Sequence, residues 1–125
     1  MTWIANGAAV PTQNTLLIVD DDIDMREALR DVLAEEGYRV VLAANGKVAL
    51  GLLPTLQRPC GIILDITMPI MSGIEFYRAM RAVPDLADIP VVFLTSDPSA
   101  VPSGSPIMSK TIRLERLLGT VTSLF

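Results

Sequence analysis

Two apolar runs in this chain end in aspartate. Residues 16–19 lead into the aspartates at 20–22, and residues 61–64 lead into Asp65. If the two runs are neighbouring parallel strands, their carboxyl ends bring several carboxylates into one crevice. Carboxylates that lie so close repel one another unless a cation lies among them. The pattern therefore predicts a divalent metal site, and it makes one of these aspartates a candidate for chemistry.

Strand and helix patterns alternate along the chain, and the elements they predict must position these carboxylates. Short apolar runs typical of buried strands occupy 16–19, 39–43, 61–64, 89–94 and 106–108. Amphipathic stripes typical of helices occupy 25–33, 48–53, 73–83 and 114–124. Strands that alternate with helices predict an α/β fold with one parallel sheet, right-handed crossovers and helices on both faces.

One edge of the predicted sheet collects most of the side chains that could do chemistry. In such sheets, ligands bind outside the carboxyl ends of the strands, where the strand order reverses. Thr95 follows the fourth predicted strand, and Lys110 follows the fifth. Together with Asp65 and the aspartates at 20–22, they bring polar groups from four strands to one edge.

Capping residues indicate where the helices begin and end. Asp22 or Asp24 suits the start of the first helix, because a short acidic side chain accepts hydrogen bonds from N–H groups of the first turn. Ser72 and Glu75 have the spacing of a capping box at the start of the third helix. Pro54 is expected to stop the second helix.

Length and composition indicate one small domain. The chain has 125 residues, of which half are hydrophobic. Its net charge of −4 argues against a nucleic-acid partner, which needs a basic face. The single cysteine, Cys60, excludes an internal disulfide and fits a reducing compartment. We expect a cytoplasmic protein without a membrane partner, because no apolar run reaches the roughly 20 residues of a spanning helix. We expect residues 1–14 to be a flexible lead-in to a domain at 15–125.

Four segments resemble motifs of bacterial two-component response-regulator receiver domains, of the single-domain kind found among chemotaxis regulators. They are 18–22 (IVDDD), 64–73 (LDITMPIMSG), 92–96 (VFLTS) and 109–110 (SK). The resemblance extends over about 15–125. It implies a flavodoxin-like, doubly wound sheet of five parallel strands in the order 2-1-3-4-5, and a phosphorelay role in signal transduction.

The resemblance implies a magnesium site. Asp20 and Asp21 would be the acidic pair that holds Mg²⁺, with Asp65 and the backbone carbonyl of Thr67 as further ligands. This donor set suits the ion, because Mg²⁺ prefers hard oxygen ligands and keeps waters and a phosphate oxygen in its octahedral shell.

The resemblance also implies the chemistry. Asp65 would be the phosphoacceptor, Thr95 the switch hydroxyl and Lys110 the cation that pairs with the phosphoryl group. A carboxylate can attack phosphorus to give an aspartyl phosphate, while a metal and a lysine neutralise charge in the transition state. A threonine hydroxyl that bonds the new phosphoryl oxygen can bias a two-state loop.

Each of these residues also has a plainer interpretation. Asp65 could cap a turn, and the acidic run could complement the dipole at a helix start. Thr95 could belong to a turn, and Lys110 could be a solvated cation. The four motifs in order favour the functional interpretation.

The chain departs from the family pattern directly after Lys110. Receivers usually carry a proline there, often after a cis peptide bond, whereas this chain has Thr111. A cis bond before another residue costs about 2.5–4 kcal/mol. We therefore expect a trans bond or a locally changed loop, which affects the placement of the Lys110 ammonium group.

The segment 96–109 is the second departure. It has three prolines and no apolar helical stripe, so we expect the fourth helix of the family to be lost or reduced to one turn. Asp97 would cap that turn and Pro98 would begin it. Ile107 stands where the family has an aromatic residue that reports the state of the threonine. The missing helix should uncover part of the sheet, and exposed apolar surface marks a partner or dimer site.

The sequence favours a stand-alone phosphorelay receiver. Its expected partners are a sensor histidine kinase or phosphotransfer protein and a downstream protein. A homodimer with a second copy of the chain is also a candidate. We expect no enzymatic activity beyond self-phosphorylation and self-dephosphorylation on Asp65. We also expect no effector module after the last helix, although the sequence leaves open that the chain is a fragment of a longer regulator. The alternative is an interaction module that works without phosphorylation, which Thr111 and Ile107 favour. A phosphoaspartate hydrolase would need an aspartate where Thr67 stands.

Overall fold

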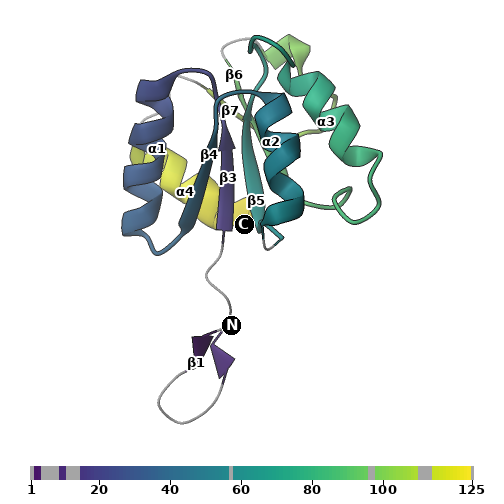
Figure 1. The fold of residues 1–125 in the computed structure, drawn as a ribbon. Coiled ribbons are helices and arrows are strands. Elements are labelled where there is room, and N and C mark those ends of the chain that lie inside the picture. Colours follow the sequence, from purple (N-terminus) through teal and green to yellow (C-terminus); the bar gives the residue numbers. More distant parts are fainter. Residues whose placement is uncertain are drawn as a thin grey trace.

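The computed structural model describes residues 2–3, 9–10, 15–56, 58–95, 98–109 and 114–124. The described strands are β1 (Thr2–Trp3), β2 (Ala9–Val10), β3 (Thr15–Val19), β4 (Arg39–Ala43), β5 (Gly61–Asp65), β6 (Val91–Thr95) and β7 (Ile107–Ser109). The described helices are α1 (Ile23–Glu35), α2 (Gly46–Leu52), α3 (Gly73–Arg81) and α4 (Leu114–Leu124), with short 3₁₀ turns η1 (Leu53–Thr55) and η2 (Pro98–Ala100). Figure 1 shows helices packed on both sides of the main sheet.

The main sheet has five parallel strands in the order β4-β3-β5-β6-β7. Numbered from β3 along the chain, this order is 2-1-3-4-5, so the predicted flavodoxin-like, doubly wound sheet is confirmed. The strand order reverses between β3 and β5, which is where such folds bind ligands.

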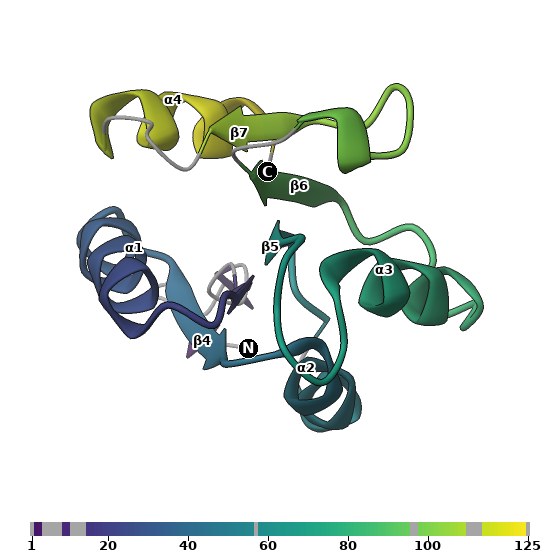
Figure 2. The ribbon, with the colours of Figure 1, turned by 90° about the horizontal axis from the view of Figure 1, so that it is seen from above.

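Helices cover both faces of the sheet, and two layers of core result. Figure 2 shows α1 and α4 on one side and α2 and α3 on the other. Alternate residues of β3 serve the two layers: Leu16 and Ile18 pack with α1 and α4, whereas Leu17 and Val19 pack with α2 and α3. Burial on both faces explains why the strands read as continuous apolar runs rather than as alternating ones.

Prolines set two of the helix ends. α2 passes directly into η1, which contains Pro54. α3 ends at Arg81 rather than at residue 83 as predicted. Val83 precedes Pro84, and the residue before a proline is disfavoured in the helical conformation. The chain leaves α3 through a turn in which the Val83 N–H donates to the Met80 carbonyl over 3.1 Å.

Near the amino end of the chain, β1 and β2 pair as a short antiparallel hairpin, with Trp3 opposite Ala9. Figure 1 shows the hairpin beyond the amino-terminal end of β3, apart from the main sheet. The division into a lead-in at 1–14 and a receiver domain at 15–125 stays a prediction.

The connection between β6 and β7 is short. In its described part, residues 98–109, the only helical element is the three-residue turn η2. The predicted loss or reduction of the fourth helix is therefore confirmed, and the turn begins at Pro98 as expected. The predicted cap, Asp97, lies outside the described residues, as does the Lys110–Thr111 bond.

The sheet beside this short connection is better covered than expected. Phe93 of β6 is fully buried, and Val91 is only 5% exposed. The Tyr77 ring of α3 meets the Phe93 ring edge-on, with 5.1 Å between centroids, and Val101 packs against the same core layer. The expectation of an uncovered sheet is thus wrong for β6, because a large aromatic side chain replaces the helix. Apolar exposure remains at Ile107, which is 42% exposed on the edge strand β7.

Candidate functional site

Asp20 and Asp65 lie at the carboxyl ends of the two neighbouring central strands. Asp20 directly follows β3, and Asp65 is the last residue of β5. The register pairs Val19 with Leu64, so the next residue of each strand arrives at the same edge of the sheet. Both aspartates are buried, with 0% and 1% of their surfaces exposed. The sequence prediction that these two acids meet is confirmed.

Asp21 completes a cluster of three carboxylates with Asp20 and Asp65. One oxygen atom from each residue lies within 4.8 Å of the other two. Asp21 is exposed, so the cluster opens to solvent on its side. Bringing carboxylates together and burying two of them is costly unless a cation lies among them. Converging hard oxygen donors are what Mg²⁺ binds, and this donor set fits a divalent ion.

The acidic run has divided roles. The Asp22 side chain caps α1 by accepting from the N–H groups of Asp24 and Met25, at 3.0 and 3.4 Å. Of the two caps that the sequence allowed, the structure therefore uses Asp22. The Asp22 N–H in turn donates to Oδ1 of Asp20 over 2.9 Å, which fixes the orientation of that buried carboxylate.

Arg26 brings a cation to the backbone beside the cluster. Its Nη1 donates to the Asp20 carbonyl oxygen over 2.9 Å, and its side chain is half-buried. This residue was not predicted as part of the site. The signal that could have found it is its position one turn after the helix cap, because side chains on a helix lean toward the N-terminal end of that helix, where β3 ends.

Gly73 shapes the loop that follows Asp65. A Cβ atom at this position would lie 2.1 Å from the Asp65 carbonyl oxygen and 2.8 Å from the Ile66 Cα. The Gly73 N–H donates to the Ile66 carbonyl over 2.8 Å, and the predicted Ser72–Glu75 capping box then starts α3. The loop can fold this tightly over the strand end only because residue 73 has no side chain. The sequence predicted the cap but not this close approach.

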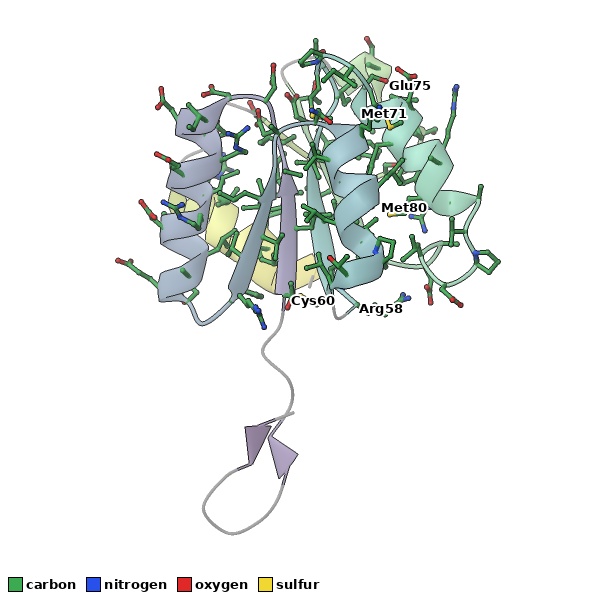
Figure 3. All side chains as sticks on the ribbon, viewed as in Figure 1. Arg58, Cys60, Met71, Glu75 and Met80 are labelled. Atoms are coloured by element: carbon green, nitrogen blue, oxygen red, sulfur yellow. The ribbon has the colours of Figure 1, made fainter. Side chains whose placement is uncertain are left out.

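Ile70 is strained in the same loop. Its φ of +72° lies in the left-handed region, which a β-branched side chain rarely adopts. The Met71 N–H donates to the Pro69 carbonyl over 2.7 Å, so Ile70 is the central residue of a γ-turn. Its side chain is 75% exposed. Gly46 at the start of α2 lies against Met71, so the loop is held from the other side (Figure 3 labels Met71 at this end).

The remaining predicted site residues lie on the next strands or in the loop. Thr95 ends β6 and is 6% exposed, and the register pairs Asp65 with Leu94, so Thr95 reaches the same edge. Lys110 follows Ser109, the last residue of β7, and lies outside the described residues. Thr67 lies two residues after Asp65 with its side chain exposed. The structure thus gathers Asp20, Asp21, Asp65 and Thr95 at one edge.

Among the described residues, we find no helix that combines the length and the apolar character needed to cross a membrane.

Comparisons with known proteins agree with this geometry. Residues 16–104 match the family model of the response regulator receiver domain. The chain is similar to the response regulator MprA of Mycolicibacterium vanbaalenii, with 36% identity over 116 residues, which cover 87% of this chain and 49% of that protein. The chain therefore spans about half the length of the curated relatives it matches.

Solved structures show the same likeness. The chemotaxis protein CheY4 of Vibrio cholerae superposes with a TM-score of 0.82 and 31% identity, over 91% of this chain and 100% of that chain. The signal receiver domain of a histidine kinase from Syntrophus aciditrophicus gives 0.79 and 35%, over 89% of each chain. With its strand order and its acidic edge, the chain belongs to the response regulator receiver domain family of two-component signalling systems.

Proposed function

We propose that this chain is a phosphorelay receiver that accepts a phosphoryl group on Asp65 in a Mg²⁺-dependent reaction. The observation that carries the proposal is the three-carboxylate cluster, in which oxygens of Asp20, Asp21 and Asp65 lie within 4.8 Å of one another. Receiver domains as a family bind Mg²⁺ through acidic residues. A nucleophilic carboxylate that shares its site with two metal-binding acids is what phosphoryl transfer to aspartate requires.

The residues divide the work as follows. Asp20, Asp21 and Asp65 would hold the ion, with the backbone carbonyl of Thr67 as a further ligand. When bound, Mg²⁺ offsets the negative charge of the carboxylates and of the incoming phosphoryl oxygens. The Asp22 N–H and the Arg26 guanidinium hold the Asp20 side chain and backbone in place, so the donor set is preorganised.

In the transfer step, a carboxylate oxygen of Asp65 attacks phosphorus. The new O–P bond forms as the bond from phosphorus to the donor breaks, and the electron pair of that bond leaves with the donor. For a phosphohistidine donor, the leaving imidazole nitrogen keeps the pair and takes a proton from solvent. Thr95 and Lys110 would then bond the phosphoryl oxygens. The turnover is limited to Asp65 itself, so we propose no separate enzymatic activity.

The output would be a change in protein contacts. Thr95 pairs in register with Ser109 at the end of β7, and the exposed Ile107 begins that strand. A hydroxyl drawn toward the phosphoryl group would therefore alter the short β6–β7 connection. The proposed partners are a sensor histidine kinase or phosphotransfer protein and a downstream protein, in the cytoplasm.

One alternative is a receiver-fold interaction module that is controlled without phosphorylation. Thr111 after Lys110 and the absence of an aromatic residue at Ile107 favour it. The clustered acids oppose it, because an unused site has no reason to keep two carboxylates buried side by side. The comparisons with response regulators also support the phosphorelay role.

The test is labelling by a small acyl phosphate with and without Mg²⁺, read by intact mass. We expect one added phosphoryl group on the parent chain with Mg²⁺ and none after Asp65→Asn. An Asp31→Asn variant is the matched control, because Asp31 is an exposed acid on α1. A parent chain that stays unlabelled while it binds Mg²⁺ would favour the phosphorylation-independent module. Hydrogen exchange that does not change in 98–109 on labelling would contradict the proposed output.

A further inference from the structure

A cavity lies between the end of α3 and the short β6–β7 connection. Its volume is about 350 Å³, within the range of small-molecule sites. Tyr77 and Arg81 of α3 line one side, 103–106 line another, and 90–92, which lead into β6, complete the lining. Figure 2 shows β6 between α3 and the yellow-green segment that leads into β7. We call this cavity the arginine pocket.

The arginine pocket is separate from the acidic edge. Val91 begins β6, whereas Thr95 ends it, and Asp65 ends β5. The register pairs Val91 with Ile62, three residues before Asp65. The pocket therefore lies at the amino-terminal end of β6, and a ligand there would not occupy the place of a phosphoryl group on Asp65.

Arg81 gives the pocket a positive charge that is held in position. Its guanidinium carbon lies 4.7 Å from the centre of the Tyr77 ring, and a cation over an aromatic face is stabilised. The Tyr77 ring is itself fixed by its edge contact with the buried Phe93 ring. The guanidinium is thus preorganised, which lowers the entropy that binding a ligand would cost.

The charge of Arg81 has no carboxylate partner within the part of the chain that the structure describes. The two ion pairs found there are those of Arg30 with Asp31 and of Arg58 with Asp88. The hydrogen bond from Arg58 is the main cause that lowers the pKa of Asp88, and the charge of Arg81 contributes least. No acidic residue is among the described residues that line the pocket. A cavity with one cation and no carboxylate attracts an anion.

The side of the pocket that faces α3 adds hydroxyl groups on a constrained turn. Ser103 and Ser105 both line the pocket. The Ser105 N–H donates to the Pro102 carbonyl over 3.1 Å, and the φ of +82° at Gly104 suits the third position of a type II turn. The Pro106 carbonyl accepts an N–H of β6 over 3.0 Å, which fixes the turn to the sheet. This side of the pocket is therefore also preorganised.

We propose that the arginine pocket binds a small organic acid, a molecule with one carboxylate and a compact apolar body. The planar guanidinium of Arg81 matches a carboxylate in bidentate geometry, and the serine hydroxyls are further donors. One guanidinium neutralises one carboxylate, whereas a phosphate dianion would leave a negative charge without a partner. The Tyr77 ring, Pro90 and Val91 offer apolar contacts to the body of the ligand.

Benzoate is a suitable probe, because it joins a carboxylate to an apolar ring. In an NMR titration of the full chain, without Mg²⁺ or a phosphodonor, we expect saturable amide shifts at 77–81, 91–92 and 103–106. Benzyl alcohol, which has the ring without the charge, should bind at least about tenfold more weakly. Inorganic phosphate should not displace benzoate. Binding of the alcohol as tight as that of benzoate, displacement by phosphate, or the absence of saturable shifts in these segments would overturn the proposal.

Variants of α3 make the second test. Arg81→Gln should weaken benzoate binding at least about tenfold, and Arg81→Lys, which keeps the charge but not the planar fork, should weaken it less. Arg78→Gln is the matched control, because Arg78 is exposed in the same last turn of α3 but does not line the pocket. Its affinity should equal that of the parent, and circular dichroism establishes that all three variants are folded. Equal affinities of the Arg81→Gln and Arg78→Gln variants would contradict the assignment of Arg81.

Discussion

The acidic edge of the sheet and the side around β6 and β7 differ in how closely they follow the family pattern. At the acidic edge, carboxylate oxygens of Asp20, Asp21 and Asp65 lie together, and Asp20 and Asp65 are fully buried. Around β6 and β7, a three-residue turn replaces a helix, and Tyr77 covers Phe93 instead. The comparison indicates that the proposed chemistry depends on a few fixed donors, whereas the neighbouring surface needs only burial and can be repacked.

The largest expected effect tests the acidic edge. Gly73→Ala should lower the free energy of unfolding by about 3 kcal/mol or more, because its Cβ would overlap the Asp65 carbonyl, which is backbone and cannot rotate away. Chemical denaturation would measure it. Gly51→Ala is the control: nothing lies within 4 Å of its Cβ in α2, so stability should rise by about 0.5–1 kcal/mol. Equal effects of the two variants would show that residue 73 does not lie close to the Asp65 carbonyl.

The next effect tests the repacked side. Tyr77→Ala should lower the free energy of unfolding by about 2 kcal/mol, because it removes a half-buried ring and its edge contact with Phe93. Mg²⁺ affinity should stay unchanged, since Tyr77 lies outside the acidic cluster. Arg81→Gln, which removes only the cation over the Tyr77 ring, should cost less than about 1 kcal/mol. If Tyr77→Ala also lost Mg²⁺ binding, the acidic edge and the side around β6 and β7 would not be independent of each other.

A third variant addresses the metal donors. Asp20→Asn should weaken Mg²⁺ binding at least about tenfold, measured by calorimetry, because an amide replaces a buried carboxylate donor. Without Mg²⁺, the same variant should be more stable than the parent, since fewer negative charges crowd the edge. Asp31→Asn, on the exposed face of α1, should change neither quantity. An Asp20→Asn protein that binds Mg²⁺ normally would remove Asp20 from the donor set.

The smallest effect concerns strain beside the site. Ile70→Gly should raise the free energy of unfolding by about 1 kcal/mol, because glycine adopts the φ of +72° without steric cost. Ile23→Gly, a similarly exposed residue at the start of α1, should lower stability instead. A thermal denaturation series compares the two. If Ile70→Gly is the less stable variant, the side chain of Ile70 makes contacts that outweigh its strain.

The meeting of Asp20 with Asp65 could be predicted from the sequence, because it follows from two apolar runs that end in aspartate. The order of the strands was implied by the resemblance to receiver domains and not by the runs themselves. The loss of the helix could also be predicted, since proline leaves little choice of conformation. The cover that replaces it could not, because Tyr77 looks like any half-buried helix residue until the structure places it over Phe93. The roles of Gly73 and Arg26 depend on close approaches to the backbone at the ends of β5 and β3, and sequence patterns do not specify such distances.

The burial of Asp20 and Asp65 at the ends of paired strands has a consequence for the newly made chain. The two aspartates are 45 positions apart, and they meet only after β3 and β5 have paired. The edge that also carries Thr95 requires β6 as well, so it is complete only when three strands have paired. If Asp65 accepts a phosphoryl group as proposed, the transfer would therefore select molecules that have completed their sheet and pass over unfinished ones. Competence for signalling would then report successful folding, without a separate check.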